Sequence, residues 1–122
     1  MYKSNQSISE NEKVTLLTVG TMSGTNLQTC LGTIKMIMRS STNVNSFMQV
    51  AEQKFKLFQG IDNLQVTVLS EIGYKLTWTD GTLTVNMPNN GTNTKNFTIW
   101  FELELFGHQW SNLTIGEKFE QM

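Results

Sequence analysis

The amino-acid sequence predicts an all-β protein built as an antiparallel β-sandwich, and three observations favour that fold class. Serine, threonine and asparagine together supply 37 of the 122 residues. Charged residues make up only 16% of the chain, against roughly 25% in an average soluble domain. Short apolar runs alternate with glycine- and asparagine-rich segments, as they do in sandwiches and barrels. A helical bundle would carry more glutamate, lysine and alanine.

Seven segments are predicted to be strands, and most of them alternate apolar and polar residues with period two. The last is the most regular, because Phe97, Ile99, Phe101, Leu103 and Leu105 share one face. The strongest hairpin signal is the Asp-Gly pair at residues 80–81, which joins two of these segments. The predicted strands are residues 13–19, 31–40, 44–60, 64–70, 74–79, 82–87 and 95–106.

The segment 44–60 also fits a helix. Val44, Phe47, Ala51, Phe55 and Phe58 are among the residues at helical spacing. Several of the same residues share one face of a strand, although glutamines interrupt that face. Because every neighbouring segment is a strand, we predict a strand here.

The chain is predicted to form one β-sandwich domain, residues 13–122, after a flexible polar lead-in, residues 1–12. A net charge of −1 provides no electrostatic footprint for nucleic acid. No apolar run is long enough for a membrane span, and the N-terminus does not read as a signal peptide. Cys30 is the only cysteine, which excludes an internal disulfide.

The sequence offers few groups for catalysis, and no enzyme activity, metal or cofactor is expected. His108 is the only histidine, and no nucleophile motif accompanies it. Glu102 and Glu104 lie two residues apart on one strand face and could imitate a pair of glycosidase carboxylates. A solvated face or a subunit contact is the more ordinary role for such a pair.

Large apolar residues also lie on the face opposite the core stripe. Ile37, Trp100 and Phe106 are the main examples. One interpretation is a bent strand or a loop packed over them. The other is a homo-oligomer interface, in which a second apolar face is buried between subunits.

Saccharide binding is the remaining candidate function. Sugar sites pair an aromatic ring with amides and carboxylates. Trp110, in the polar context GHQWSN, is expected to be exposed, and with His108 and Asp80 it forms the predicted ligand site. Trp78 shares a face with Tyr74 and is expected in the core instead.

The order of segments resembles C-terminal jelly-roll domains of bacteriophage tail and fibre proteins. The resemblance covers roughly residues 12–108 and is carried mainly by VTVLSEIGYKLTWTDGTLTVNM. It implies a jelly roll of about eight strands, assembled as a trimer on the virion. The family has no fixed binding motif, so no site residue is implied.

The function expected from this resemblance is a non-enzymatic virion adhesion module that binds a host cell-surface saccharide or receptor. Other virion proteins are the further expected partners, and the chain would be made in the host cytoplasm. The alternative is a structural capsid or tail decoration protein that acts only through oligomerisation. A small glycan hydrolase using Glu102 and Glu104 is a third possibility, for which no turnover is expected.

Overall fold

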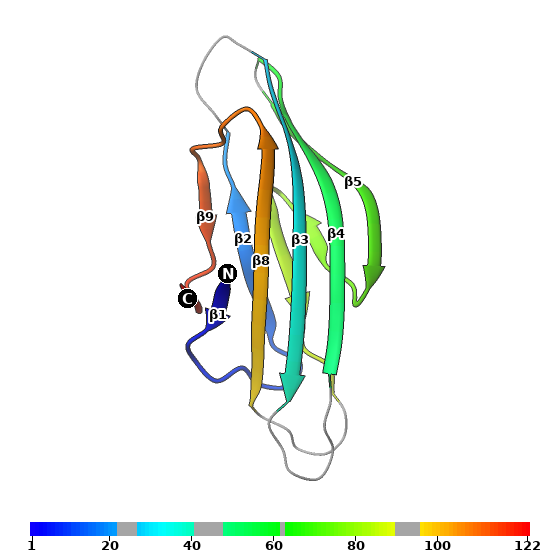
Figure 1. Ribbon diagram of the computed structural model, residues 1–122, viewed down its shortest axis with the longest axis vertical. Helices are drawn as coiled ribbons and strands as arrows, with labels where there is room; N and C mark the ends of the chain where they lie inside the picture. Colours follow the sequence, from blue (N-terminus) through cyan, green and yellow to red (C-terminus); the bar gives the residue numbers. More distant parts are fainter. Residues whose placement is uncertain (22–26, 41–47, 62, 90–95) are drawn as a thin grey trace.

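The computed structural model describes residues 1–21, 27–40, 48–61, 63–89 and 96–122. In those residues the chain forms ten β-strands (Figure 1). None of them forms a helix that is long and apolar enough to cross a membrane. The strands are β1 (Tyr2–Ser4), β2 (Lys13–Val19), β3 (Gln28–Ser40), β4 (Met48–Gln59), β5 (Leu64–Gly73), β6 (Thr77–Thr79), β7 (Thr82–Asn86), β8 (Phe97–Gly107), β9 (Leu113–Ile115) and β10 (Phe119–Gln121).

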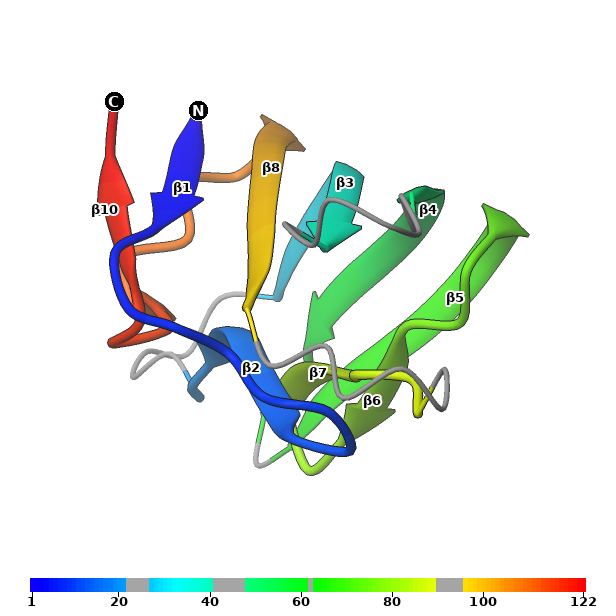
Figure 2. The same cartoon turned by 90° about the horizontal axis from the view of Figure 1, so that it is seen from below.

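The strands pack as the two layers of a sandwich (Figure 2). The large sheet has the order β10-β1-β8-β3-β4-β5, and the small sheet has the order β6-β7-β2-β9. Within the large sheet β3, β4 and β5 form a meander, and β8 returns beside β3, which is the order of a Greek key. A jelly roll contains two such Greek keys, and the large sheet supplies one. The predicted sandwich is confirmed, with ten strands in the described residues rather than about eight.

The core lies between the inner faces of the two sheets, as the period-two pattern predicts. On β8, Phe97, Ile99 and Phe101 are fully buried, whereas Leu105 is 37% exposed. The predicted apolar stripe therefore contributes to the core along its first half. The other buried apolar side chains include Ile34, Met36 and Met38 of β3, Phe55 and Leu57 of β4, and Leu16, Leu17, Leu83 and Val85 of the small sheet.

The ambiguous segment is a strand where it is described. β4 pairs with β3 along its whole length, from Gln59 opposite Gln28 to Met48 opposite Arg39. The strand prediction is confirmed for residues 48–59, and residues 44–47 lie outside the described part of the chain. The glutamine that interrupts the apolar face, Gln53, is 1% exposed and lies in the core.

The N-terminal residues belong to the fold, which corrects the expectation of a flexible lead-in. β1 lies between β8 and β10 in the large sheet. Ile8 is fully buried, and its carbonyl accepts a hydrogen bond from the Phe97 amide. Polar composition hides this role, because a three-residue strand is too short to show an apolar period.

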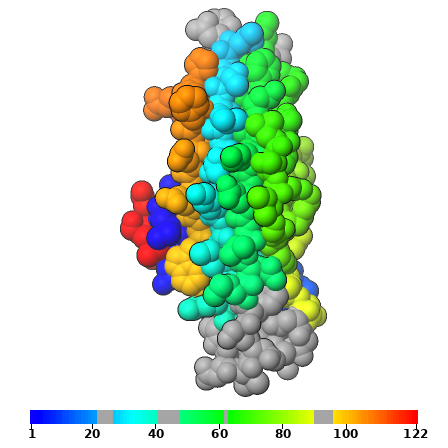
Figure 3. All heavy atoms as spheres, turned by 45° about the vertical axis from the view of Figure 1, so that its right-hand side comes forward, coloured from blue at the N-terminus to red at the C-terminus, as the bar shows by residue number. Residues whose placement is uncertain are grey.

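The outer face of the large sheet is not covered by other described parts of the chain. Side chains of β8, β3, β4 and β5 lie next to one another on it (Figure 3). Ile37 is 45% exposed there and Phe106 is 75% exposed. In the rest of the text this surface is called the outer face.

Candidate functional site

An open cleft of about 560 Å³ lies where β5 and β6, the edge strands of the two sheets, come together. We call it the edge cleft. Its polar side chains are Thr21, Asn63 and Asp80, and its aromatic side chain is Trp78. The lining residues are Val19, Gly20, Thr21, Asn63, Leu64, Val66, Trp78, Asp80 and Gly81.

The turn between β6 and β7 presents Asp80 to this cleft. Asp80 has a φ of 49° and Gly81 a φ of 80°, the positive pair that a type I′ hairpin turn requires. The Gly81 carbonyl accepts a hydrogen bond from the Val19 amide at 2.8 Å. A Cβ at position 81 would lie 2.6 Å from the Val19 carbonyl oxygen. The turn is therefore fastened to β2 only if residue 81 is glycine.

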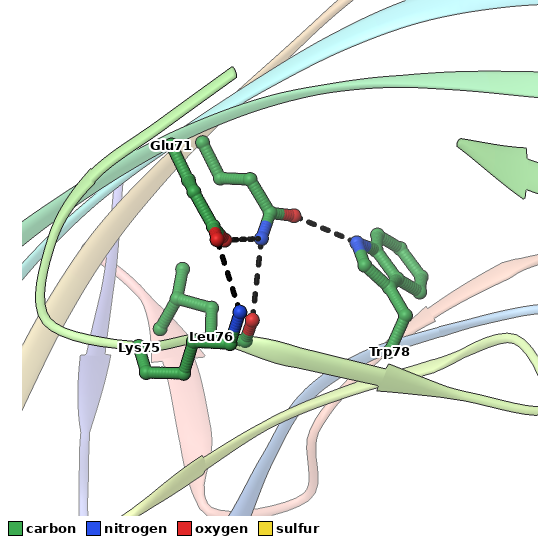
Figure 4. Close-up of polar contacts among 5 residues, drawn as sticks. Glu71, Lys75, Leu76 and Trp78 are labelled. Carbon is green, nitrogen blue, oxygen red and sulfur yellow. Dashed lines mark hydrogen bonds and ion pairs between the residues drawn. The ribbon is translucent and has the colours of Figure 1, made fainter. Parts of the chain in front are cut away.

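Trp78 is held in one orientation from inside the core (Figure 4). Its Nε1 donates a hydrogen bond of 2.7 Å to Oε1 of Gln53. The ring meets Phe55 edge to face, with the centroids 5.0 Å apart. Because Trp78 also remains partly exposed and lines the edge cleft, its indole is both fixed and accessible.

The amide of Gln53 is in turn fixed by two acceptors. Its Nε2 donates to the Leu76 carbonyl at 3.3 Å and to a carboxylate oxygen of Glu71 at 3.4 Å. Lys75 forms an ion pair of 3.0 Å with the same carboxylate. The hydrogen bond from Lys75 holds the pKa of Glu71 below its ordinary value. The network therefore links β4, β5 and the segment leading into β6.

The opposite wall of the cleft is braced by the segment after β8. Trp110 Nε1 donates to the Gly20 carbonyl at 3.2 Å, and Asn112 Nδ2 donates to the Thr21 carbonyl at 2.9 Å. The Gly20 amide donates to the Asn112 carbonyl at 2.7 Å. These contacts fix the end of β2, where Gly20 and Thr21 line the cleft.

The structure separates the three residues predicted to form the ligand site. Asp80 lines the edge cleft. Trp110 is only 5% exposed, so the expectation that its ring is exposed is wrong. His108 is exposed at the end of β8, where its Nδ1 lies 3.0 Å from the Thr29 amide and accepts its hydrogen bond. Neither His108 nor Trp110 is among the residues that line the cleft.

Trp78 is the cleft residue that the sequence interpretation assigned to the core. Its ring does pack on the core residue Phe55, but part of it also faces the cleft. A usable signal was present, since Trp78 in β6 lies only two residues before Asp80 in the turn that follows.

The residues predicted for an oligomer interface share the outer face. Ile37 and Trp100 are cross-strand partners. Phe106 lies opposite Leu31, further along the same strands. Glu102 and Glu104 also lie on this face, opposite Lys35 and Thr33 respectively, and not in the edge cleft.

Comparison with known proteins gives little further information. No protein-family model matches the chain, and no curated protein matches it. Among solved structures, the tailspike protein of Acinetobacter phage vB_ApiP_P1 has a TM-score of 0.49 and 14% sequence identity. The alignment covers 93% of this chain, which spans 22% of the length of that tailspike. We draw no inference from a likeness of this size, and the proposals below rest on the residues of this chain.

Proposed function

We propose that this chain is a virion adhesion module that binds a saccharide of the host cell surface in the edge cleft. The observation that carries the proposal is the placement of Trp78 and Asp80 in one cleft, with the indole fixed by Gln53. An aromatic ring offers its face to the apolar side of a sugar, while a carboxylate accepts hydrogen bonds from its hydroxyls. The assignment to a virion rests on the resemblance of the segment order to phage tail and fibre domains.

The lining of the cleft favours a neutral saccharide. Asp80 is the charged side chain among the described lining residues, and none of them is lysine or arginine. A uronic acid, sialic acid or phosphorylated sugar would place its own negative charge near Asp80 without a cation to pair with. Asn63 and Thr21 add an amide and a hydroxyl for hydrogen bonding.

Binding is tested with an array of bacterial surface polysaccharides and with tryptophan fluorescence. We expect the chain to be retained on neutral polysaccharides and its tryptophan emission to change on binding. Asp80→Asn should weaken binding by about tenfold, because it replaces a charged acceptor by a neutral one. Asparagine also tolerates a positive φ, so the turn should be preserved. Trp78→Phe should remove most of the emission change.

The matched control is Glu104→Gln, which removes a carboxylate from the outer face and should leave binding unchanged. Retention on no polysaccharide, or unchanged affinity of Asp80→Asn, would contradict the proposal. Release of new reducing ends that is lost when Glu102 and Glu104 are both changed to glutamine would point to a hydrolase instead. A chain that assembles with other virion proteins and binds no saccharide would favour the structural decoration role.

A further inference from the structure

Two cationic side chains converge on the ring of Trp100, on the outer side of the large sheet. Lys3 Nζ lies 5.7 Å from the centre of that ring, and the guanidinium carbon of Arg39 lies 5.4 Å from it. Lys3 belongs to β1 and Arg39 to β3, the strands on either side of β8. Cations at this distance are attracted to the electron-rich face of an indole. The ring therefore gathers two positive charges from two different strands.

These two charges lack a carboxylate partner. In the described residues neither Lys3 nor Arg39 forms an ion pair. Glu120 on β10 is the register partner of Lys3, but the ammonium group lies over the indole, on the other side of β1. The register partners of Arg39 are uncharged. The next carboxylate along β8, Glu102, is the register partner of another cation, Lys35. Unpaired cations held close together attract anions.

An open polar cleft of about 340 Å³ begins beside the cations, between the segment after β1 and the start of β8. We call it the polar cleft. Lys3 lines it, and so does Glu120. Amides and hydroxyls of this kind form hydrogen bonds with the hydroxyl groups of a saccharide. The lining side chains that supply them include Asn5, Gln6, Ser7, Asn96 and Thr98.

We propose that Arg39, Lys3 and Trp100 form a binding site for the anionic group of an acidic saccharide, whose hydroxyls enter the polar cleft. Arg39 donates to the anion through its planar fork of N–H groups, and Lys3 adds a point charge. Trp100 positions both cations without neutralising them. The anionic group is the carboxylate of a uronic acid or the phosphate of a sugar phosphate, since both fit a pair of cations.

This site does not rest on the function proposed for the edge cleft. The edge cleft lies beside β5, at the edge of the large sheet that is opposite β1 and β10. Its charged side chain in the described residues is Asp80, which disfavours an anion. The two cations at Trp100 favour one instead. The two sites would therefore select different sugars, neutral at the edge cleft and acidic beside the polar cleft.

The test uses two acidic polysaccharides, polygalacturonate with carboxylates and a teichoic acid with phosphates, and measures binding by isothermal titration calorimetry. The unmodified chain should bind one or both, and its affinity should fall as salt is added, because salt screens exposed charges. The polymer that binds more tightly identifies the anionic group. Arg39→Gln and Lys3→Gln should each weaken this binding about tenfold, because each removes a charge-assisted hydrogen bond.

Lys54→Gln is the matched control, because Lys54 is an exposed lysine on the same side of the sheet and its removal changes the net charge equally. It should bind like the unmodified chain. Arg39→Lys keeps the charge but loses the planar fork, so its affinity should lie between those of Arg39→Gln and the unmodified chain. Circular dichroism of each variant separates a folding defect from a loss of binding.

Binding of neither polymer would overturn the proposal, including where another subunit covers the outer face. Equal weakening by Lys54→Gln and Arg39→Gln would also overturn it, because binding would then follow net charge alone. A single-stranded oligonucleotide bound as tightly as either polymer would overturn the assignment to a saccharide. Asp80→Asn should leave the binding of acidic polymers unchanged, and Arg39→Gln should leave the binding of neutral ones unchanged. Failure at one site is thereby distinguished from failure at the other.

Discussion

Gln53 shows how one buried polar residue can serve both the core and the cleft. It is 1% exposed, and its amide contacts Trp78, Leu76 and Glu71. A buried amide is tolerated only when its donors and acceptors are paired. Here the pairing also sets the direction of the indole that lines the edge cleft. Gln53 interrupts the apolar face of β4 because its side chain forms a hydrogen bond with Trp78 in the opposite sheet.

The first prediction concerns this residue. Gln53→Leu removes the acceptor of Trp78 Nε1 and the donor to the Leu76 carbonyl. Leaving such groups unpaired should lower the free energy of unfolding by about 1–3 kcal/mol. Urea unfolding followed by circular dichroism measures the change.

Gln65→Leu is the matched control, because Gln65 is exposed on β5, the strand next to β4. It should change stability by less than about 0.5 kcal/mol. Equal effects of the two substitutions would show that the Gln53 network contributes no specific stability.

At the scale of elements, β3 and β4 depend on a glycine within the sheet. A Cβ built at Gly32 would lie 2.3 Å from the ring of Phe55. Gly32 and Phe55 are cross-strand partners, so the ring lies over the glycine backbone. The same ring contacts Trp78 edge to face. Because position 32 has no side chain, the Phe55 ring can lie where it packs against Trp78, which lines the edge cleft.

We therefore predict that Gly32→Ala pushes the Phe55 ring away from its place and destabilises the fold by about 1–3 kcal/mol, as overpacking does. It should also change tryptophan fluorescence, since Trp78 packs on that ring. Thr33→Ala, at the neighbouring position on the outer face, is the control and should leave the emission spectrum unchanged. An unchanged stability and spectrum for Gly32→Ala would contradict this reading of the packing.

Most of the elements could be predicted from the sequence because each long strand carries its own apolar alternation. β2, β3, β5, β7 and β8 were recognised in this way. β1, β9 and β10 are three residues long, too short for a period to appear, so they were not predicted. Their positions depend on pairing with distant segments, such as β1 with β8 and β10.

The cleft was predictable only in part, for a similar reason. Asp80 could be placed by its turn, which is encoded locally. The burial of Trp110 depends on the Gly20 carbonyl, 90 residues away in the chain, and its polar neighbours in sequence gave the opposite impression. Long-range hydrogen bonds of this kind leave no local pattern.

At the scale of the whole molecule, an ion pair joins the segment before β2 to the turn before β10. Lys118 Nζ donates a hydrogen bond to the carboxylate of Glu12, and the Lys118 carbonyl accepts one from the Asn5 amide at 2.8 Å. The hydrogen bond from Lys118, with one from the Ser9 amide, lowers the pKa of Glu12. This pair ties the small sheet to the edge of the large sheet.

The ion pair should make stability depend on pH. Because the pKa of Glu12 is lower in the folded chain than in the unfolded chain, its contribution is complete above the ordinary glutamate pKa. It is lost as the pH falls through the lowered value. Glu12→Gln should therefore cost up to about 1 kcal/mol at neutral pH, and the difference from the unmodified chain should disappear in acid.

Urea unfolding of both proteins across the acidic and neutral range measures this difference. Glu117→Gln is the control, since Glu117 is an exposed carboxylate next to Lys118 in the chain. A difference for Glu12→Gln that persists unchanged into strong acid would show that the effect is not electrostatic.

The position of β1 has a consequence for how the chain is made. β1 is held by β8 and β10, and the Met122 amide donates a hydrogen bond of 2.9 Å to the Met1 carbonyl. During synthesis the first strand leaves the ribosome long before either of its partners exists. The meander of β3, β4 and β5 can form early, because its contacts are close in sequence. The edge formed by β1 and β10 can close only after β10 has emerged, so this part of the large sheet is completed after the meander.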